Sequence, residues 1–234
     1  RSHAGRISIN FALLALLCLA VLVSLRFGSL RLGFGQILET LWRRSGDIPY
    51  QIIFNIRLPR IFLGALVGGS LAVSGAILQG VMRNPLAAPG IIGVSAGGGL
   101  AGILVMLALP QFGHLLVPAA FAGALATAVL VYLLAWKRGV NPVRLILSGV
   151  AVAGMLGAFS STILLLNADK AGGVLDFSIG TLSARSWPQI EQVWLYMAAG
   201  FAAAMLMSNK LNILALGDEV ATGLGMRVER IRLL

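Results

Sequence analysis

One string in this sequence has the pattern of a catalytic nucleophile: Gly93-Val94-Ser95-Ala96-Gly97. In hydrolases a Gly-x-Ser-x-Gly string places the serine on a sharp turn between a strand and a helix, where a histidine can take its proton. Here the string follows a Pro-rich turn and opens an apolar helix, and His114 is expected at the opposite end of that helix. We therefore interpret the string as a close-packed helix start, and an intramembrane serine hydrolase as the weaker alternative.

The groups that ion-coupled carriers and ATPases use are missing from the expected places. No long apolar run contains Asp, Glu, Lys or Arg near its middle, whereas ion-coupled carriers commonly hold buried ionisable groups there. No Gly-x-x-x-x-Gly-Lys-Ser/Thr string occurs, so the chain cannot bind ATP phosphates with that loop. The sequence thus predicts no catalytic residue, no metal site and no cofactor on this chain. An ion-coupled secondary transporter is kept as a further alternative.

Composition indicates that these elements lie in a membrane. Hydrophobic residues occupy 58% of the 234 positions and charged residues 11%, and the mean hydropathy is +0.92. A single soluble core could not bury that much apolar surface. The net charge of +10 comes from basic residues scattered singly between apolar runs, not from a basic stripe, which argues against nucleic acid as a partner. The lipid bilayer is the expected surroundings.

Charge-free apolar windows predict an all-α, polytopic transmembrane helix bundle. The first window is expected to be a retained helix and not a cleaved signal peptide, because no small-x-small cleavage site follows it. Ten basic residues fall on the side of the N-terminus and eight on the other side, which favours a cytoplasmic N-terminus. Small residues at every fourth position of the second and fifth windows indicate close helix contacts, and a pathway-lining role for them stays open. The six predicted spans are approximately residues 7–25, 61–82, 91–109, 114–136, 145–166 and 192–208.

Two stretches carry more specific information. Arg57-Leu58-Pro59-Arg60 leads into the second span, which ends in a string that contains Asn84-Pro85-Leu86-Ala87. The second stretch is Leu214-Ala215-Leu216-Gly217-Asp218-Glu219-Val220-Ala221-Thr222-Gly223-Leu224-Gly225. Together, and at this mutual spacing, they closely resemble the FecCD/BtuC family, the permeases of bacterial ABC importers for iron–siderophores, haem and cobalamin. The resemblance runs through all 234 residues.

The resemblance implies a plan that composition cannot supply. Permeases of this family have ten spans, lie in the bacterial inner membrane and pair as homodimers or heterodimers. Each pair sits on two cytoplasmic ATP-binding cassette subunits, which hold the ATP and Mg, and an extracytoplasmic substrate-binding protein docks on the outer face. By this resemblance, residues 1–234 form a single BtuC-like transmembrane permease domain that represents the first six of ten spans and is incomplete at its C-terminal end.

The resemblance also assigns a docking role to Arg57 and Arg60. It places both residues on the outer face, where they pair with acidic residues of the substrate-binding protein. Arginine suits this role because its planar guanidinium binds carboxylates with two parallel hydrogen bonds, and exposed charge pairs set the orientation of a complex. Ordinary snorkelling of the side chains toward the membrane interface is the alternative.

Residues 217–230 resemble the family's coupling segment, which contacts the ATPase between the sixth and seventh spans. Asp218 and Glu219 stand where a short helix would begin, as acidic residues at helix N-termini do. Ala221, Leu224 and Val228 recur at helical spacing and predict an apolar stripe for a groove in the partner, with an amphipathic helix on the membrane surface as the alternative. The residues assigned to coupling are Leu216, Gly217, Asp218, Glu219, Ala221, Leu224 and Gly225.

Two further turns receive an assignment. By resemblance, the turn Asn141-Pro142-Val143-Arg144 narrows the cytoplasmic exit, although relatives often have small hydroxylic residues where this chain has Pro142 and Val143. Asn84, Pro85 and Pro89 are interpreted as structural, because proline disfavours a helical residue before it and asparagine can bond the backbone of its own turn.

These observations together predict a transport subunit and not an enzyme. The expected function is that of a permease of a type II ABC importer that translocates an iron–siderophore complex, with ATP hydrolysis on a partner subunit. Haem and cobalamin are alternative cargoes, because permeases for all three share these strings.

Overall fold

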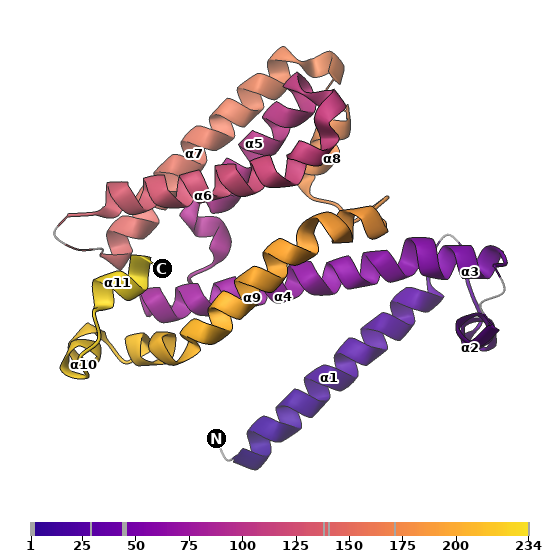
Figure 1. Ribbon diagram of the computed structural model, residues 1–234, viewed down its shortest axis with the longest axis horizontal. Helices are drawn as coiled ribbons and strands as arrows, with labels where there is room; N and C mark the ends of the chain where they lie inside the picture. The colour runs from indigo at the N-terminus through magenta and orange to yellow at the C-terminus, as the bar shows by residue number, and fades with distance from the viewer. Residues whose placement is uncertain are drawn as a thin grey trace. The chain divides into compact units, whose positions relative to one another are not determined.

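The computed structural model describes residues 3–28, 30–43, 46–137, 139, 141–170 and 172–233, and every regular element among them is a helix (Figure 1). This confirms the all-α prediction. The long helices are α1 (His3–Arg26), α4 (Leu58–Met82), α6 (Leu116–Ala135), α7 (Pro142–Leu166) and α9 (Trp187–Ala215). The shorter ones are α2 (Phe34–Arg43), α3 (Ile48–Ile52), α5 (Val94–Ala108), α8 (Gly172–Ile179), α10 (Asp218–Gly223) and α11 (Val228–Leu233). A π-helical turn covers Ile53–Arg57, and 3₁₀ turns cover Pro89–Ile92, Pro110–Leu115 and Ala168–Lys170.

Five helical segments of the described chain are long and apolar enough to cross a membrane. They are Ile7–Arg26, Ile48–Met82, Pro110–Ala135, Pro142–Leu166 and Trp187–Ala215. The remaining predicted span corresponds to α5, which has 15 residues and is therefore about 22 Å long, against a hydrocarbon thickness of about 30 Å. A transmembrane helical fold is thus confirmed, and a sixth crossing at α5 stays a prediction.

Two helix boundaries differ from those of the predicted windows, because a charged residue does not end a helix. The sixth predicted window stops at 208, before Lys210, whereas α9 continues to Ala215, because a long basic side chain does not break a helix and can extend toward the polar interface. The fifth predicted window begins at 145, whereas the corresponding helix, α7, begins at Pro142. There Asn141 Oδ1 accepts a hydrogen bond of 2.9 Å from the backbone N–H of Val143, and proline is favoured in the first helical turn.

The chain divides into two compact units, which are described separately. Unit 1 comprises Arg1–Val67 and Leu182–Trp194. Its centre is a cluster of buried aliphatic side chains from the end of α1, the following loop, α2 and the π-helical turn. The Trp187 indole Nε1 donates a hydrogen bond of 2.8 Å to the carbonyl oxygen of Phe54 in that turn. The buried cluster consists of Leu25, Leu32, Ile37 and Ile53.

Unit 2 comprises Gly68–Thr181 and Leu195–Leu234. Its core is formed by residues from the end of α4, the segment between α4 and α5, α6 and α7. Partly buried apolar side chains, among them Leu78, Leu145 and Ile146, pack around this core. The buried residues of the core are Met82, Ala87, Ile92, Val131 and Val152.

Backbone contact between the helices of unit 2 depends on a few glycines. A Cβ atom on Gly97 of α5 would lie 2.6 Å from the carbonyl oxygen of Gly123 of α6, and a Cβ atom on Gly149 of α7 would lie 2.8 Å from the Cα atom of Ile92. Small residues therefore allow close helix approach at these points, as membrane helices require. The expected contact is present at Gly149, whereas other members of the two small-residue stripes have open space beside them. Those members are Gly68, Gly80 and Gly157.

Candidate functional site

Arg57 is buried inside unit 1 and is not available at the surface. It is 7% exposed, and its guanidinium donates from Nη1 to the carbonyl oxygen of Leu25 and from Nη2 to that of Leu30. The Leu25 carbonyl belongs to the last turn of α1, where no intrahelical donor remains for it, and a cation is favourable at that end of a helix dipole. A Cβ atom on Gly28 would lie 2.9 Å from Nη2, so glycine leaves room for the guanidinium. Arg57 therefore caps α1 and closes the loop that follows it.

Arg60, by contrast, is exposed. Two helical residues three positions apart point in directions about 60° apart around the helix axis, which is enough for the edge of the buried face to pass between them. The expectation that both arginines present their charge to a partner therefore does not fit the burial of Arg57. Docking through Arg60 stays a prediction.

The turn after α4 has the structural role that its sequence indicates. The backbone N–H of Asn84 donates to the carbonyl oxygen of Gln79 at 3.2 Å, which is the six-to-one bond of a Schellman C-cap with Arg83 in the left-handed region at φ 49°. The backbone N–H of Leu86 then donates to Asn84 Oδ1 at 2.9 Å, as in an Asx turn. The chain thus leaves α4 sharply before Pro85, and Pro89 begins a 3₁₀ turn.

The coupling segment consists of two short helices and not of one continuous helix. α10 begins at Asp218 with Glu219 in its first turn, as expected. It ends in a Schellman motif in which Met226 N–H donates to Ala221 O at 3.0 Å, Gly225 N–H donates to Thr222 O at 2.9 Å, and Gly225 adopts φ 79°. The left-handed glycine terminates α10, so the prediction of a single helical stripe through Val228 is wrong.

The exposed apolar surface of this segment therefore differs from the predicted one. Ala221 is fully buried at 0% exposure and cannot contact a partner in this arrangement. Leu224 is exposed, as predicted, and it is accompanied by two residues spaced four positions apart along the chain, Leu216 and Val220. Gly217, immediately before α10, is buried and adopts φ 118° and ψ 155°, a conformation essentially restricted to glycine. Its role in the segment is to direct the chain out of α9 into α10.

A salt-bridge cluster at this end of unit 2 was not anticipated. Asp218 Oδ1 lies 2.8 Å from Nη2 of Arg232 in α11 and 3.8 Å from Nη2 of Arg83 after α4. The Arg232 side chain is only 5% exposed, whereas those of Asp218 and Arg83 are 41% and 45% exposed. No helical period relates these three positions, so sequence patterning offered no signal for the cluster.

The predicted gate residues form the entrance of α7 and not a free turn. Asn141 is the N-cap, and Pro142, Val143 and Arg144 occupy the first helical positions. Arg144 Nη1 donates to the carbonyl oxygen of Lys137 at 3.4 Å, and Val143 is 63% exposed. A constriction of the exit by these residues stays a prediction.

The nucleophile string lacks the geometry of a hydrolase. Gly93 adopts φ 77° as N-cap of α5, and Ser95 lies inside that helix, with a 3₁₀ turn and not a strand before it. His114 lies in the 3₁₀ turn after α5, so the 15-residue helix separates the two groups. Among the described residues, no three His, Cys, Asp or Glu side chains form a group that could hold a metal ion.

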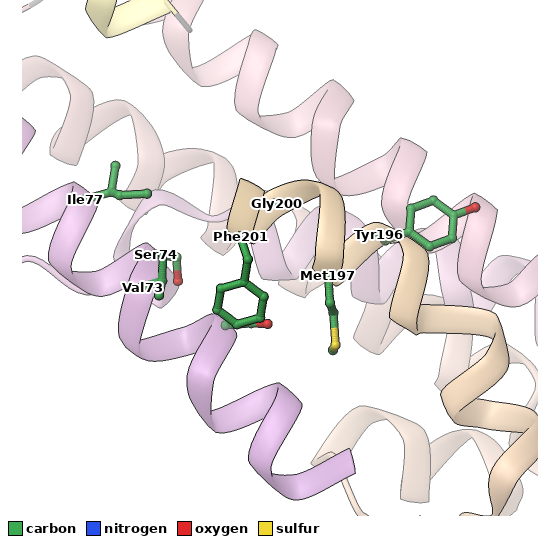
Figure 2. Close-up of a pocket in the computed structure, with 8 residues that line it drawn as sticks. Val73, Ser74, Ile77, Tyr196, Met197, Gly200 and Phe201 are labelled. Atoms are coloured by element: carbon green, nitrogen blue, oxygen red, sulfur yellow. The ribbon is translucent and has the colours of Figure 1, made fainter. Parts of the chain in front are cut away.

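Two hollows in unit 2 are lined without charged residues. One, of about 360 Å³, lies between α4 and α9, with Phe201 directed from α9 toward α4 (Figure 2). The other, of about 510 Å³, is formed by α5, α7 and α8 and includes four serines. Apolar and hydroxyl groups suit helix packing, lipid or an uncharged part of a cargo. The residues of the first hollow are Ser70, Val73, Ser74, Ile77, Tyr196, Met197, Gly200 and Phe201, and the serines of the second are Ser95, Ser160, Ser161 and Ser178.

Comparison with known proteins gives relatives along the whole chain. The Fe(3+)-citrate import system permease protein YfmD of Bacillus subtilis (strain 168) is 34% identical over 234 residues, which cover all of this chain and 70% of that protein. The cobalamin import system permease protein BtuC of Halobacterium salinarum is 42% identical over 183 residues, or 77% of this chain and 49% of that protein. The chain therefore spans only part of the length of these relatives.

The fold comparison agrees with the sequence relatives. A solved structure, described as an inward-facing conformation of an ABC transporter of the metal-chelate type, superposes with a TM-score of 0.81 and 29% identity. The match covers 96% of this chain and 70% of that one, and this is the BtuC-like permease architecture that the resemblance predicted. The FecCD transport family matches residues 16–234, and the chain belongs to that family.

Proposed function

We propose that this chain is the membrane-spanning part of a permease of an ABC importer, which moves an iron–siderophore complex across the bacterial inner membrane. ATP and Mg bind to a partner ATPase, and the permease performs no covalent chemistry. The observation that carries the proposal is the exposed apolar surface of Leu216, Val220 and Leu224 at a short helix that directly follows a long span. Exposed apolar patches with a polar rim mark sites of interaction with another protein or with a membrane, and the partner proposed here is a protein.

The polar rim of this surface agrees with a docking role. Glu219 and Thr222 are exposed beside Val220, and Arg227 is exposed after the Schellman turn. A helix that inserts an apolar ridge into a groove is a recurrent mode of recognition, and the surrounding charges set its orientation. In the proposed assembly this surface contacts one of two ATP-binding cassette subunits, and the N-terminus lies in the cytoplasm.

On the outer side, the proposal gives the docking role to Arg60. Its exposed guanidinium can bind a carboxylate of a substrate-binding protein, whereas Arg57 supports the position of that region by capping α1. A second permease subunit completes the pathway. Homodimer and heterodimer are both compatible with these residues.

The iron–siderophore cargo is proposed over haem and cobalamin. The relatives include permeases named for Fe(3+)-citrate and for cobalamin, and an iron chelate is the cargo in the name of the relative that aligns with all of this chain. An ion-coupled carrier is disfavoured, because the described spans hold no acidic residue near their middle.

The test uses the complete transporter, reconstituted in liposomes with its ATPase and substrate-binding protein. Uptake of a ⁵⁵Fe-loaded siderophore, of haem and of cobalamin is measured with ATP inside, without ATP, and with an imposed proton gradient alone. The proposal requires ATP-dependent accumulation of the iron chelate. Uptake driven by the proton gradient without ATP would overturn the importer class, and uptake restricted to haem or cobalamin would overturn the cargo.

A pair of variants tests the coupling surface in the same preparation. Leu224→Ala removes an apolar side chain that is 64% exposed on the coupling segment, and the matched control Leu206→Ala removes one that is 83% exposed on α9. We expect substrate-stimulated ATP hydrolysis to fall about fivefold in the first variant, which corresponds to an interface residue that contributes about 1 kcal/mol, and to stay unchanged in the second. Equal activity of the two variants would contradict the assignment.

A further inference from the structure

The side chain of Arg232 contacts residues of α10 and also lies beside the first residues of α7. It lies in α11, and its side chain is 5% exposed. A buried guanidinium loses much hydration free energy, so it persists only where hydrogen bonds and an opposite charge compensate. Its Nη2 donates a 2.8 Å hydrogen bond to Asp218 Oδ1 of α10, which supplies both.

The stem of Arg232 lies where the ends of three membrane helices meet. Together with the last residues of α4, the C-terminal part of α6 and the first residues of α7, it lines a hollow of only about 20 Å³, roughly the volume that one water needs. Arg232 therefore lies directly beside the ends of these three helices. The other lining residues are Val81, Met82, Tyr132, Pro142 and Leu145.

Two further charged residues, Arg83 and Glu229, lie close to the elements that Arg232 contacts. Arg83, which follows α4, lies 3.8 Å from the same Asp218 oxygen. Glu229, one turn before Arg232 in α11, lies against the loop between α6 and α7, because a Cβ atom on Gly139 would be 2.7 Å from Glu229 Oε1. α11 thus contacts the coupling helix through one charge and the approach to α7 through another.

We propose that Arg232 is a positioning residue that connects the coupling helix α10 to the entrance of α7. A displacement of α10 by an ATPase moves Asp218, the hydrogen bond transfers that displacement to Arg232, and the packed stem transfers it to Pro142 and Leu145. Tight packing makes such an arrangement move as a unit and not deform gradually. This inference rests on the proposed function, since it supposes that α10 receives the motion of a partner.

Arginine is needed here for its shape as well as its charge. The guanidinium is planar and presents several donors in fixed directions, whereas the lysine ammonium is a compact point charge that is more strongly hydrated. Arg232→Lys should therefore keep the protein folded and retain part of the contact. Arg232→Gln should remove the charge while it preserves most of the side-chain volume.

The experiment measures transported iron chelate per ATP hydrolysed in liposomes that contain the complete transporter. We expect the ratio to fall about tenfold in Arg232→Gln, within the range typical of coupling between sites, and less in Arg232→Lys. The control Arg230→Gln changes an exposed arginine of the same helix and should leave the ratio unchanged. An unchanged ratio in Arg232→Gln would overturn the inference.

A second measurement separates positioning from general support of the fold. The exchange variant Asp218→Arg with Arg232→Asp reverses the pair, and a double-mutant cycle with the two single changes isolates the pairwise contribution. We expect partial recovery of the ratio, and a spin label at an exposed Thr222→Cys should show increased mobility of α10 in Arg232→Gln. Additive losses with unchanged label mobility would refute the connection.

Failure of the proposed function has a different outcome. If the unmodified transporter shows no ATP-dependent uptake, the importer assignment is wrong whatever the variants do. If the unmodified transporter shows ATP-dependent uptake but the Arg232 variants behave like the Arg230→Gln control, the importer assignment stands and the proposed role of Arg232 is wrong.

Discussion

Replacement of Arg57 by alanine tests whether this residue supports the fold or serves only as a docking group. The change removes the donors to the carbonyl oxygens of Leu25 and Leu30. A hydrogen bond from a charged donor contributes about 1.5–3 kcal/mol, and a buried carbonyl left without a donor loses comparable free energy. Water can reach part of the loop, so we expect a local destabilisation of about 2–4 kcal/mol for the two bonds together.

Hydrogen exchange of the complete permease in detergent or nanodiscs measures this effect directly. The backbone amides of Phe27 and Leu32, which donate to Val23 O at 2.9 Å and Arg26 O at 3.3 Å, report on the end of α1 and its loop. Since 1.4 kcal/mol corresponds to a factor of ten, we expect exchange at these amides to accelerate at least about 30-fold in Arg57→Ala. Arg57→Lys should give an intermediate value, because one ammonium cannot reproduce the fork of the guanidinium.

The matched control is Arg60→Ala. Arg60 is exposed on the same segment, and substitutions at such positions usually change stability by less than about 0.5 kcal/mol. Exchange at the loop amides should therefore stay unchanged in this variant. Unchanged exchange in Arg57→Ala, or an equal acceleration in Arg60→Ala, would refute the reasoning.

Three further outcomes follow from the same structure. Arg60→Glu should weaken binding of the substrate-binding protein, measured by pull-down or surface plasmon resonance, without faster exchange in the loop, and unchanged binding would contradict the docking role. Gly225→Ala should destabilise the coupling segment by about 1–2 kcal/mol, because φ 79° is unfavourable for alanine, whereas Gly223→Ala, helical and with open space beside it, should not. The measurement is hydrogen exchange in α10, and equal exchange in both variants would be inconsistent with the Schellman turn. Gly97→Ala should lower the free energy of unfolding of the permease by about 1–3 kcal/mol, because the added methyl group overpacks against α6. Gly99→Ala, with nothing within 4 Å, should leave this free energy nearly unchanged.

Local features of this protein could be predicted well from residue type and spacing. Five of the six apolar windows correspond to long helices, since the free energy of burying apolar groups in lipid depends on composition over about 20 residues. Asn84 and Asn141 bond backbone groups two residues away, a relation that needs no distant part of the chain. The start of α10 at Asp218 likewise follows from short-range preferences.

Errors arose where the outcome depended on neighbours far away in the chain. The stripe predicted through Ala221 assumed one continuous helix, but a six-residue helix has too few turns for periodicity to identify its exposed face. Ala221 is buried and Leu216 is exposed, and the left-handed glycine at 225 ends the helix before Val228. The exposed surface proposed for coupling could be identified only with these turns in place.

The amino-acid sequence by itself determined that this is a membrane protein of helices and that it resembles the FecCD transport family. These properties depend on the composition of many residues or on motifs of neighbouring residues, so they can be recognised without knowledge of the packing. Only the tertiary structure decided that Arg57 is a buried cap while Arg60 is exposed, and that Arg232 joins Asp218 across 14 positions of the chain. The physical reason is that burial of a charge depends on which distant carbonyl or carboxylate the fold brings to it, and no local pattern encodes that partner.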